Sequence, residues 1–126
     1  RNLLFLSIAS SIAYNREIEN IIIGVCETDF SGYPDCRDEF IKSMKKTIHL
    51  ATEKSIEIHT PLMNLDKAQT WKLAKDLGCI NTIIKSTMTD YNGSQNKNDW
   101  GLGNLDNPAS ILRHKGYIKA KKNKWI

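Results

Sequence analysis

A run of chemically versatile side chains follows the apolar segment 21–25 and precedes an amphipathic segment that begins near Arg37. Residues 26–37 carry three carboxylates, a guanidinium, a phenol and two thiols, on Glu27, Asp29, Asp35, Arg37, Tyr33, Cys26 and Cys36. Gly32 and Pro34 within this run are typical of a defined turn. A loop that leaves the carboxyl end of a strand is where α/β proteins usually bind ligands. The sequence therefore predicts a ligand-binding loop at this point.

The chain has three cysteines, Cys26, Cys36 and Cys79, and no C-x-x-C pair occurs. A zinc knuckle is therefore not supported, and the odd count points to reduced thiols in the cytosol. Cys26 and Cys36 flank the loop, where a thiol can be reactive. The alternative, which we favour, is that both side chains simply pack.

Length and composition are those of one modest globular domain, with 126 residues, 40% hydrophobic and 25% charged. No apolar run approaches the roughly 20 residues that a bilayer-spanning helix needs. The apolar start lacks the charged leader and cleavage pattern of a signal peptide. The chain opens on Arg1 and Asn2, directly before a helical pattern and without an initiating Met. We interpret it as a segment of something longer.

The net charge is +4, and much of the excess is near the C-terminus. A basic run there contains Lys115, Lys119, Lys121, Lys122 and Lys124, with Tyr117 and Trp125 nearby. One interpretation is a nucleic-acid-binding tail. The other, which we favour because no nucleic-acid motif accompanies the run, is a solvated terminal helix with a frayed end.

Apolar spacing predicts an alternation of helices and strands. Strands are expected at residues 21–25 and 55–59. Helices are expected at residues 2 to about 14, 37–51, 66–78, 80–84 and from 107 onward. In the third of these helices Asp66 would be the N-cap and Gly78 the C-cap. The first helix should be mostly buried, and the strand at 21–25 should be buried too. Residues 87–107 have loop composition. The alternation predicts a parallel α/β sheet that is too small to be complete.

Several of these segments resemble a known family, the QueC family of 7-cyano-7-deazaguanine synthases in queuosine biosynthesis. The resemblance is carried by residues 1–6, the run 24–40, His59 to Met63, Lys67 to Trp71, Tyr91-Asn92-Gly93, Leu112-Arg113 and Gly116. It covers nearly the whole chain, and the motif of the long loop is highly specific.

The resemblance implies an ATP-pyrophosphatase-type fold, like that of adenine nucleotide alpha hydrolases. It implies an enzyme that uses ATP with Mg to convert 7-carboxy-7-deazaguanine and ammonia into 7-cyano-7-deazaguanine in the cytoplasm. The substrate would be bound by the polar residues of the loop, Glu27, Asp29, Ser31, Tyr33, Asp35 and Arg37. Arg1 matches a family arginine and would face nucleotide phosphate. Asp38 and Glu39 are expected only to complement the helix dipole.

Two departures from the family pattern matter. The phosphate-binding Ser-Gly-Gly-x-Asp-Ser loop is absent, and the chain has no Gly-Gly pair. The chain therefore looks like a C-terminal portion, and we expect it not to turn over ATP alone. The four cysteines of the family's structural zinc site fall near Asp90, Leu102, Leu105 and Ser110 in this sequence. None is Cys, so we expect no zinc there, with His114 an exposed residue. Trp100, Leu102 and Leu105 would hold the loop instead.

These considerations predict two regions, residues 1–86 as part of the nucleotide- and deazaguanine-binding α/β domain and residues 87–126 as the former zinc-loop region with the basic helix. The family commonly forms homodimers, and we expect neither membrane association nor direct nucleic-acid binding. Two alternatives remain open. One is a zinc-free QueC-like protein that modifies another substrate, and the other is a non-catalytic binding fragment.

Overall fold

The computed structural model describes residues 1–28 and 33–126. The chain forms two compact units, Arg1–Asn64 and Leu65–Ile126, and each is described by itself. No helix in the described ranges is both long and apolar enough to cross a membrane. These units are defined by packing, so the functional division predicted at residue 86 stays a prediction.

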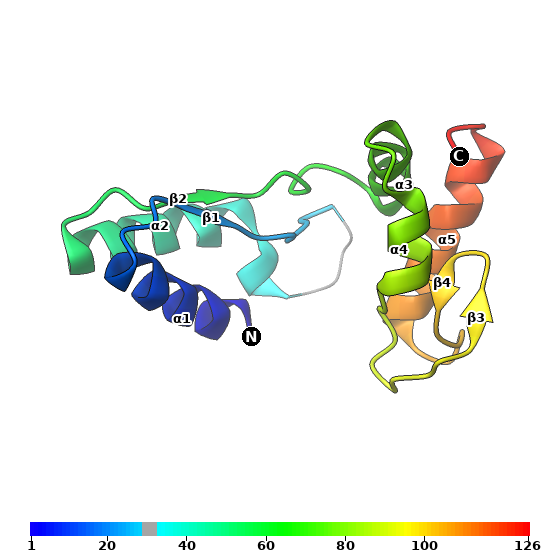
Figure 1. Ribbon diagram of the computed structural model, residues 1–126, viewed down its shortest axis with the longest axis horizontal. Helices are drawn as coiled ribbons and strands as arrows, with labels where there is room; N and C mark the ends of the chain where they lie inside the picture. Colours follow the sequence, from blue (N-terminus) through cyan, green and yellow to red (C-terminus); the bar gives the residue numbers. More distant parts are fainter. Residues whose placement is uncertain (29–32) are drawn as a thin grey trace. The chain divides into compact units, whose positions relative to one another are not determined.

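The first unit contains the predicted parallel strands and helices. Its elements are α1 (Asn2–Asn15), β1 (Asn20–Ile22), a 3₁₀ turn η1 (Pro34–Cys36), α2 (Asp38–Thr52) and β2 (Glu57–His59). The strands pair in parallel, with Ile21 opposite Ile58, and α2 lies in the connection between them (Figure 1). This is a βαβ crossover, which confirms the predicted α/β class, although both strands are shorter than expected.

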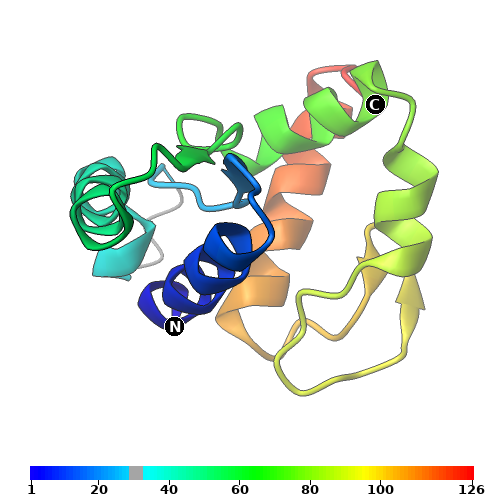
Figure 2. The same ribbon diagram turned by 60° about the vertical axis from the view of Figure 1, so that its left-hand side comes forward.

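The core of the first unit lies between the strand pair and its two helices. Apolar residues at helical spacing on α2 are buried there, as the sequence predicted. The buried cluster consists of Leu6, Ala13, Val25, Ile41, Met44, Ile48, Ile56 and Met63. Figure 2 shows α1 and α2 on the same side of β1 and β2. The helices of the described unit therefore cover one face of the strand pair.

Burial in α1 and β1 differs from the prediction. The buried positions of α1 are Asn2, Leu6, Ser10 and Ala13, while most of its large apolar side chains are exposed. Small side chains at Ser10 and Ala13 suit close packing against the core. On β1, Ile21 packs against the core and Ile22 is exposed, because successive side chains of a strand point to opposite faces. The expectation that both segments are mostly buried is therefore wrong.

The second unit is built from three helices and a short hairpin. Its elements are α3 (Lys67–Asp76), α4 (Ile80–Ser86), β3 (Lys97–Asn98), β4 (Gly101–Leu102) and α5 (Pro108–Lys122). The predicted N-cap is confirmed: Asp66 accepts from the Gln69 N–H at 2.8 Å, and the Gln69 side chain accepts from the Asp66 N–H at 2.8 Å. Gly78 follows the helix with φ +68°, a conformation that favours glycine.

Helices α3 and α5 lie side by side in the second unit (Figure 1). Their contact is close because position 116 is glycine: a Cβ added there would lie 2.4 Å from the Lys67 Cβ. The rings of Trp71 and Tyr117 meet edge to face, with centroids 5.1 Å apart. The chain end also packs, since the Trp125 N–H donates to the Ala120 carbonyl at 3.0 Å and its side chain contacts this core. A frayed end is therefore not observed.

Candidate functional site

A hollow of about 500 Å³ lies at the N-terminal ends of α1 and α2 in the first unit. Its lining residues are Arg1, Leu3, Pro34, Asp35, Arg37, Glu39, Phe40 and Ser43. The hollow brings together three of the predicted binding residues, Arg1, Asp35 and Arg37. Two guanidinium groups, two carboxylates and an aromatic ring therefore border one space, which suits a flat polar ligand that carries negative charge.

The carboxylate of Asp35 is fixed by two donors from the beginning of α1. The backbone nitrogen of Arg1 lies 3.0 Å from its Oδ2, and the backbone N–H of Asn2 donates to the same oxygen at 2.7 Å. This carboxyl is ionised at neutral pH and keeps lone pairs for a further donor.

Asn2 was not among the residues that sequence reasoning selected. The residue is only 8% exposed, and its Nδ2 donates to the Asp35 carbonyl oxygen and to the Cys36 Sγ, both at 3.2 Å. These bonds join the start of α1 to η1, a segment more than thirty residues away in sequence. No local pattern could have predicted that pairing.

The turn η1 positions Arg37 at the entrance to α2. The Arg37 N–H donates to the Pro34 carbonyl at 3.2 Å, and Arg37 itself is the extended N-cap residue of the helix. Its side chain is exposed and borders the hollow. A guanidinium beside the N-terminus of a helix can pair with a carboxylate or a phosphate in two parallel hydrogen bonds.

Glu27 is bonded to the beginning of α2 and to a neighbouring segment of the first unit. Its Oε2 accepts from the Asp38 N–H at 3.2 Å, at the beginning of α2, and its own N–H donates to the Met63 carbonyl at 3.0 Å. Glu27 and Tyr33 are not among the residues that line the hollow, and the Tyr33 side chain is exposed. The predicted residues Asp29 and Ser31 lie outside the described residues.

The two cysteines of the loop pack within the first unit, as favoured from the sequence. Cys26 is buried, and its Sγ lies 3.1 Å from the Thr28 hydroxyl. Cys36 is half-buried against the core and accepts the hydrogen bond from Asn2. No disulfide bond joins the three cysteines, all of which lie in the described part of the chain.

Asp90 and Ser110, which lie near the positions expected from the resemblance for zinc ligands, approach each other around Gly103. A Cβ added at Gly103 would lie 3.0 Å from the Asp90 Oδ2 and 3.2 Å from the Ser110 Oγ. The Asp90 carboxylate accepts from the N–H groups of Asn92 and Asn104, each at 2.7 Å. Within residues 1–28 and 33–126, no group of three or more His, Cys, Asp or Glu side chains could hold a metal ion. The donors present here do not fit a structural zinc site.

The segment before α5 is held by a buried arginine as well as by packing. Arg113 is 6% exposed, and its guanidinium donates to carbonyl and hydroxyl oxygens of three preceding segments. The acceptors are the carbonyl of Trp100 at 2.9 Å, the carbonyl of Ile83 at 3.0 Å and the hydroxyls of Thr87 and Thr89 at 3.0 Å.

The apolar packing expected to hold this segment is only partly present. Trp100 belongs to the buried cluster, but Leu102 is half-buried and Leu105 is 51% exposed. His114 is half-buried rather than exposed, and its ring is tilted against that of Trp100 with centroids 5.8 Å apart. Hydrogen bonds to a buried guanidinium therefore replace part of the predicted apolar packing.

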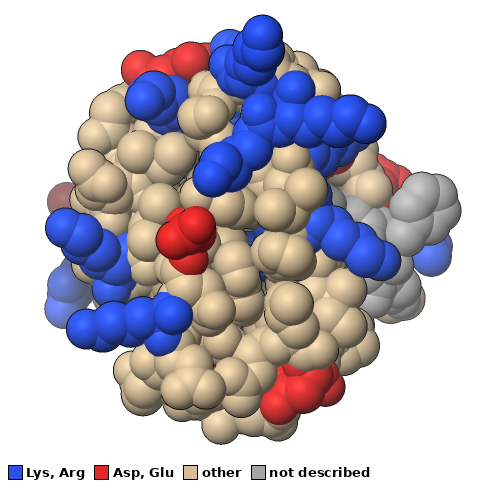
Figure 3. Space-filling model, turned by 90° about the vertical axis from the view of Figure 1, so that its right-hand side faces the viewer, with Lys and Arg blue, Asp and Glu red and all other residues tan. Residues whose placement is uncertain are grey.

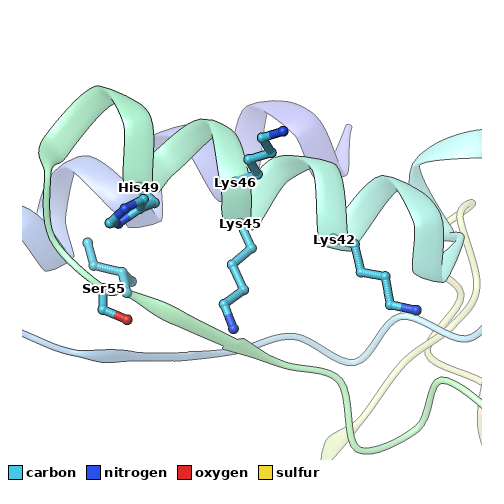
Figure 4. A pocket seen from close by; sticks show the side chains of 6 residues that line it. Lys42, Lys45, Lys46, His49 and Ser55 are labelled. Carbon is cyan, nitrogen blue, oxygen red and sulfur yellow. The ribbon is translucent and has the colours of Figure 1, made fainter.

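A smaller hollow of about 250 Å³ lies beside α2 and is lined mainly by basic residues. Lys42 and Lys45 extend from one side of the helix, and Lys46 extends from the other (Figure 4). Lys45 forms an ion pair with Glu57, and Lys42 pairs with Asp38. The predicted binding residues do not line this hollow, so it is not our candidate site.

The basic helix α5 uses its aromatic and charged groups within its own unit. Tyr117 is buried, and Lys119 donates to the Asp66 carboxylate at 2.7 Å. Figure 3 shows Lys and Arg side chains in several groups that are separated by neutral surface. Tyr117 is therefore not available to stack on a base, as aromatic residues in single-strand binding proteins do.

Comparison with known proteins agrees with the loop motif. Residues 1–121 match the sequence model of the family described as queuosine biosynthesis protein QueC. The chain is 55% identical over 124 residues to the 7-cyano-7-deazaguanine synthase of Staphylococcus haemolyticus (strain JCSC1435), covering 96% of this chain and 53% of that protein. It is 56% identical over 117 residues to the synthase of that name from Bacillus subtilis (strain 168), covering 93% and 51%.

A further relative, the 7-cyano-7-deazaguanine synthase of Staphylococcus epidermidis (strain ATCC 12228 / FDA PCI 1200), is 55% identical over 116 residues, which are 92% of this chain and 50% of that protein. The chain thus spans about half the length of the curated relatives it matches. The family match extends over nearly all of the chain and includes both units. The chain therefore belongs to the QueC family of queuosine biosynthesis proteins.

Proposed function

We propose that the protein supplies the deazaguanine-binding part of an ATP-dependent ligase that makes 7-cyano-7-deazaguanine from 7-carboxy-7-deazaguanine and ammonia. The observation that carries this proposal is the identity of 55–56% to curated 7-cyano-7-deazaguanine synthases. Because the chain spans about half of those relatives, the complete reaction belongs to a protein that also has the other half.

The reaction needs the substrate carboxylate to become a better electrophile before ammonia can attack it. ATP with Mg supplies that activation by adenylation, first for amide formation and again for the dehydration of the amide to the nitrile. The residues of this chain would bind and orient the reactants. An ATP-pyrophosphatase-type fold would provide the phosphate-binding part, and we place the protein in the cytoplasm as a homodimer.

Arg37 is the residue we assign to the carboxylate of the substrate. It is an exposed guanidinium at the N-terminus of α2 and borders the same hollow as Asp35. A bidentate pair with a carboxylate suits its planar fork. Asp35, which has acceptor capacity left, would accept a guanine-like N–H. Arg1, also at the hollow, would contact nucleotide phosphate.

The remaining loop residues complete the proposed pocket. Glu27, Asp29 and Ser31 would accept or exchange hydrogen bonds with the polar edge of the base, and Tyr33 would stack on its ring. Glu27 is the weakest member of this set, because its carboxylate is already bonded to the start of α2. We propose no zinc ligand in this chain.

Calorimetric titration with 7-carboxy-7-deazaguanine tests the proposal directly. We expect the chain to prefer this compound over 7-deazaguanine, which lacks the carboxylate. Arg37→Ala should weaken binding about tenfold or more, since a charge-assisted hydrogen bond contributes about 1.5–3 kcal/mol. Lys42→Ala is the matched control, because Lys42 is a cation on the same helix that does not line the hollow. Equal affinity for both compounds, or an unchanged affinity after Arg37→Ala, would contradict the assignment.

A further inference from the structure

Helix α1 carries an exposed apolar stripe on the side that faces away from its own core. Leu4, Ile8 and Ile12 are spaced four residues apart, which places them on one helix face. Their exposed fractions are 61%, 51% and 48%, and the neighbouring Phe5 is 54% exposed. The residues at the core are Leu6, Ser10 and Ala13, with Asn2. The stripe is thus the more hydrophobic of the two faces.

The composition of α1 does not fit a helix with one face in water. Residues 2–15 contain no Asp, Glu, Lys or Arg, so the solvent side has none of the charges that a surface helix normally displays. The hydroxyl groups of three serines donate to carbonyl oxygens of the same helix, four residues earlier, so they too are satisfied within the helix. Apolar surface on both sides is typical of a helix that lies between two packed layers.

The strand β1 has a second uncovered surface, on the side of the strand pair opposite the helices. Ile22 is 74% exposed, whereas its neighbours Ile21 and Ile23 pack against the core. The strand pair is parallel, and α1 and α2 both lie on one side of it (Figure 2). Parallel sheets occur almost only with both faces covered, so the face that bears Ile22 lacks a covering element among the described residues of this unit.

We propose that the stripe of α1, formed by Leu4, Phe5, Ile8 and Ile12, is a contact surface for the half of the QueC protein that this chain does not match, and that the same half covers the separate strand face that bears Ile22. The curated relatives are about twice as long as the matched segment, which covers 50–53% of them. They therefore carry about as much polypeptide again, enough to extend the strand pair and cover its open face. The inference rests on the family and on burial, and it does not depend on the proposed activity.

The experiment co-expresses this chain with the part of the Bacillus subtilis relative that lies outside the 117 matched residues, with an affinity tag on that part. We expect the two polypeptides to purify together in a 1:1 ratio. Carbene footprinting, read by mass spectrometry, should label the side chains of residues 2–15 in the chain alone and lose at least half of that labelling in the complex.

Variants identify the surface. Leu4→Lys combined with Ile8→Lys should weaken association at least tenfold, because it places two charges in an apolar contact. Leu50→Lys is the control, since Leu50 is 70% exposed but lies on α2. Circular dichroism of each variant alone should match the parent chain, and the footprinting result requires no variant at all.

Four results would overturn the proposal. The polypeptides could fail to purify together, or they could associate while the labelling of α1 stays unchanged. The stripe could already be protected in the isolated chain. Finally, light scattering could find a dimer of this chain that Leu4→Lys with Ile8→Lys converts to monomer, which would assign the stripe to a second copy.

Discussion

The Nε of Arg113 donates to the carbonyl oxygen of Trp100 at 2.9 Å, so a helix residue is bonded to the backbone of the segment that precedes its helix. The same guanidinium also reaches Thr87, Thr89 and Ile83. Burial lowers the pKa of Arg113, and the group stays ionised because an arginine loses its proton only far above neutral pH. The Arg113 guanidinium thus connects α4, the hairpin segment and α5.

Arg113→Lys should destabilise the second unit by about 3 kcal/mol, because an ammonium cannot replace the fork and leaves buried carbonyl groups unpaired. All three tryptophans, Trp71, Trp100 and Trp125, belong to this unit, so tryptophan fluorescence during urea unfolding reports on it selectively. Lys115→Met, an exposed change on the same helix, should shift stability by less than about 0.5 kcal/mol. Equal stability of Arg113→Lys and the parent would show that these bonds contribute nothing.

Gly101→Ala should destabilise the same unit by about 2 kcal/mol or more. The added Cβ would lie 2.5 Å from the Arg113 Nη2, and the backbone φ of +118° is unfavourable for any side chain. Gly93→Ala is the comparison, because Gly93 also has a positive φ, +72°, but has nothing within 4 Å of the added atom. The difference between the variants in urea unfolding measures the steric conflict together with the greater backbone strain at φ +118°. If they are equally unstable, backbone strain alone is responsible.

The cap of α3 should make the stability of the second unit depend on pH. The Asp66 pKa lies below its ordinary value of 3.8, chiefly because Lys119 Nζ donates to the carboxylate, and also because the Gln69 N–H does. A carboxyl whose pKa is depressed by folding contributes its stability fully above the unfolded pKa, and that contribution disappears as pH falls through the folded pKa. The loss should therefore occur below about pH 4.

Replacement of Asp66 by Ala should cost about 1 kcal/mol at pH 7, the usual effect of losing an N-cap. Between pH 6 and pH 3 the variant should lose less stability than the parent chain does. Lys119→Met should reduce the same pH dependence while keeping the cap, with a smaller loss of about 0.2–1 kcal/mol at pH 7. An identical pH dependence in all three proteins would remove Asp66 as its source.

Local features of the fold were predictable from sequence because they depend on a few adjacent residues. The Asp66 N-cap, the glycine at position 78 and the amphipathic α2 follow from capping chemistry and helical spacing. Burial was less predictable. The same apolar spacing that predicts α1 does not say which face meets the core, and the small residues Ser10 and Ala13 proved to be inside.

Hydrogen bonds between residues far apart in sequence explain why only part of the candidate site could be predicted. The turn between Tyr33 and Arg37 was expected from Pro34, and its neighbours Asp35 and Arg37 do border one hollow. The partner that fixes the turn, Asn2, lies more than thirty residues earlier and has no motif of its own. Arg113 was likewise noted only as part of a resemblance, since its acceptors are mostly backbone carbonyls and threonine hydroxyls. Such bonds leave no pattern in side-chain types.

Zinc should be absent from the purified protein. The chain has no Cys after Cys79, so it cannot supply the four thiolates of the zinc site that the resemblance implies. Inductively coupled plasma mass spectrometry should find far less than one zinc per chain, and EDTA should leave the urea-unfolding midpoint unchanged. One zinc per chain, removable only together with the loss of fold, would contradict this prediction.

Asn2→Ala should weaken the binding of 7-carboxy-7-deazaguanine severalfold, although Asn2 itself is not a lining residue of the hollow. The change removes the bonds from Nδ2 to the Asp35 carbonyl and the Cys36 Sγ, so η1 and the adjoining Arg37 lose their fixed position. Calorimetry measures the effect, with Asn15→Ala at the other end of α1 as control. If Asn2 acts by positioning Arg37, the double variant with Arg37→Ala should bind no more weakly than Arg37→Ala alone. Additive losses would instead assign Asn2 an independent role, because two residues that act through one contact cannot both lose its full contribution.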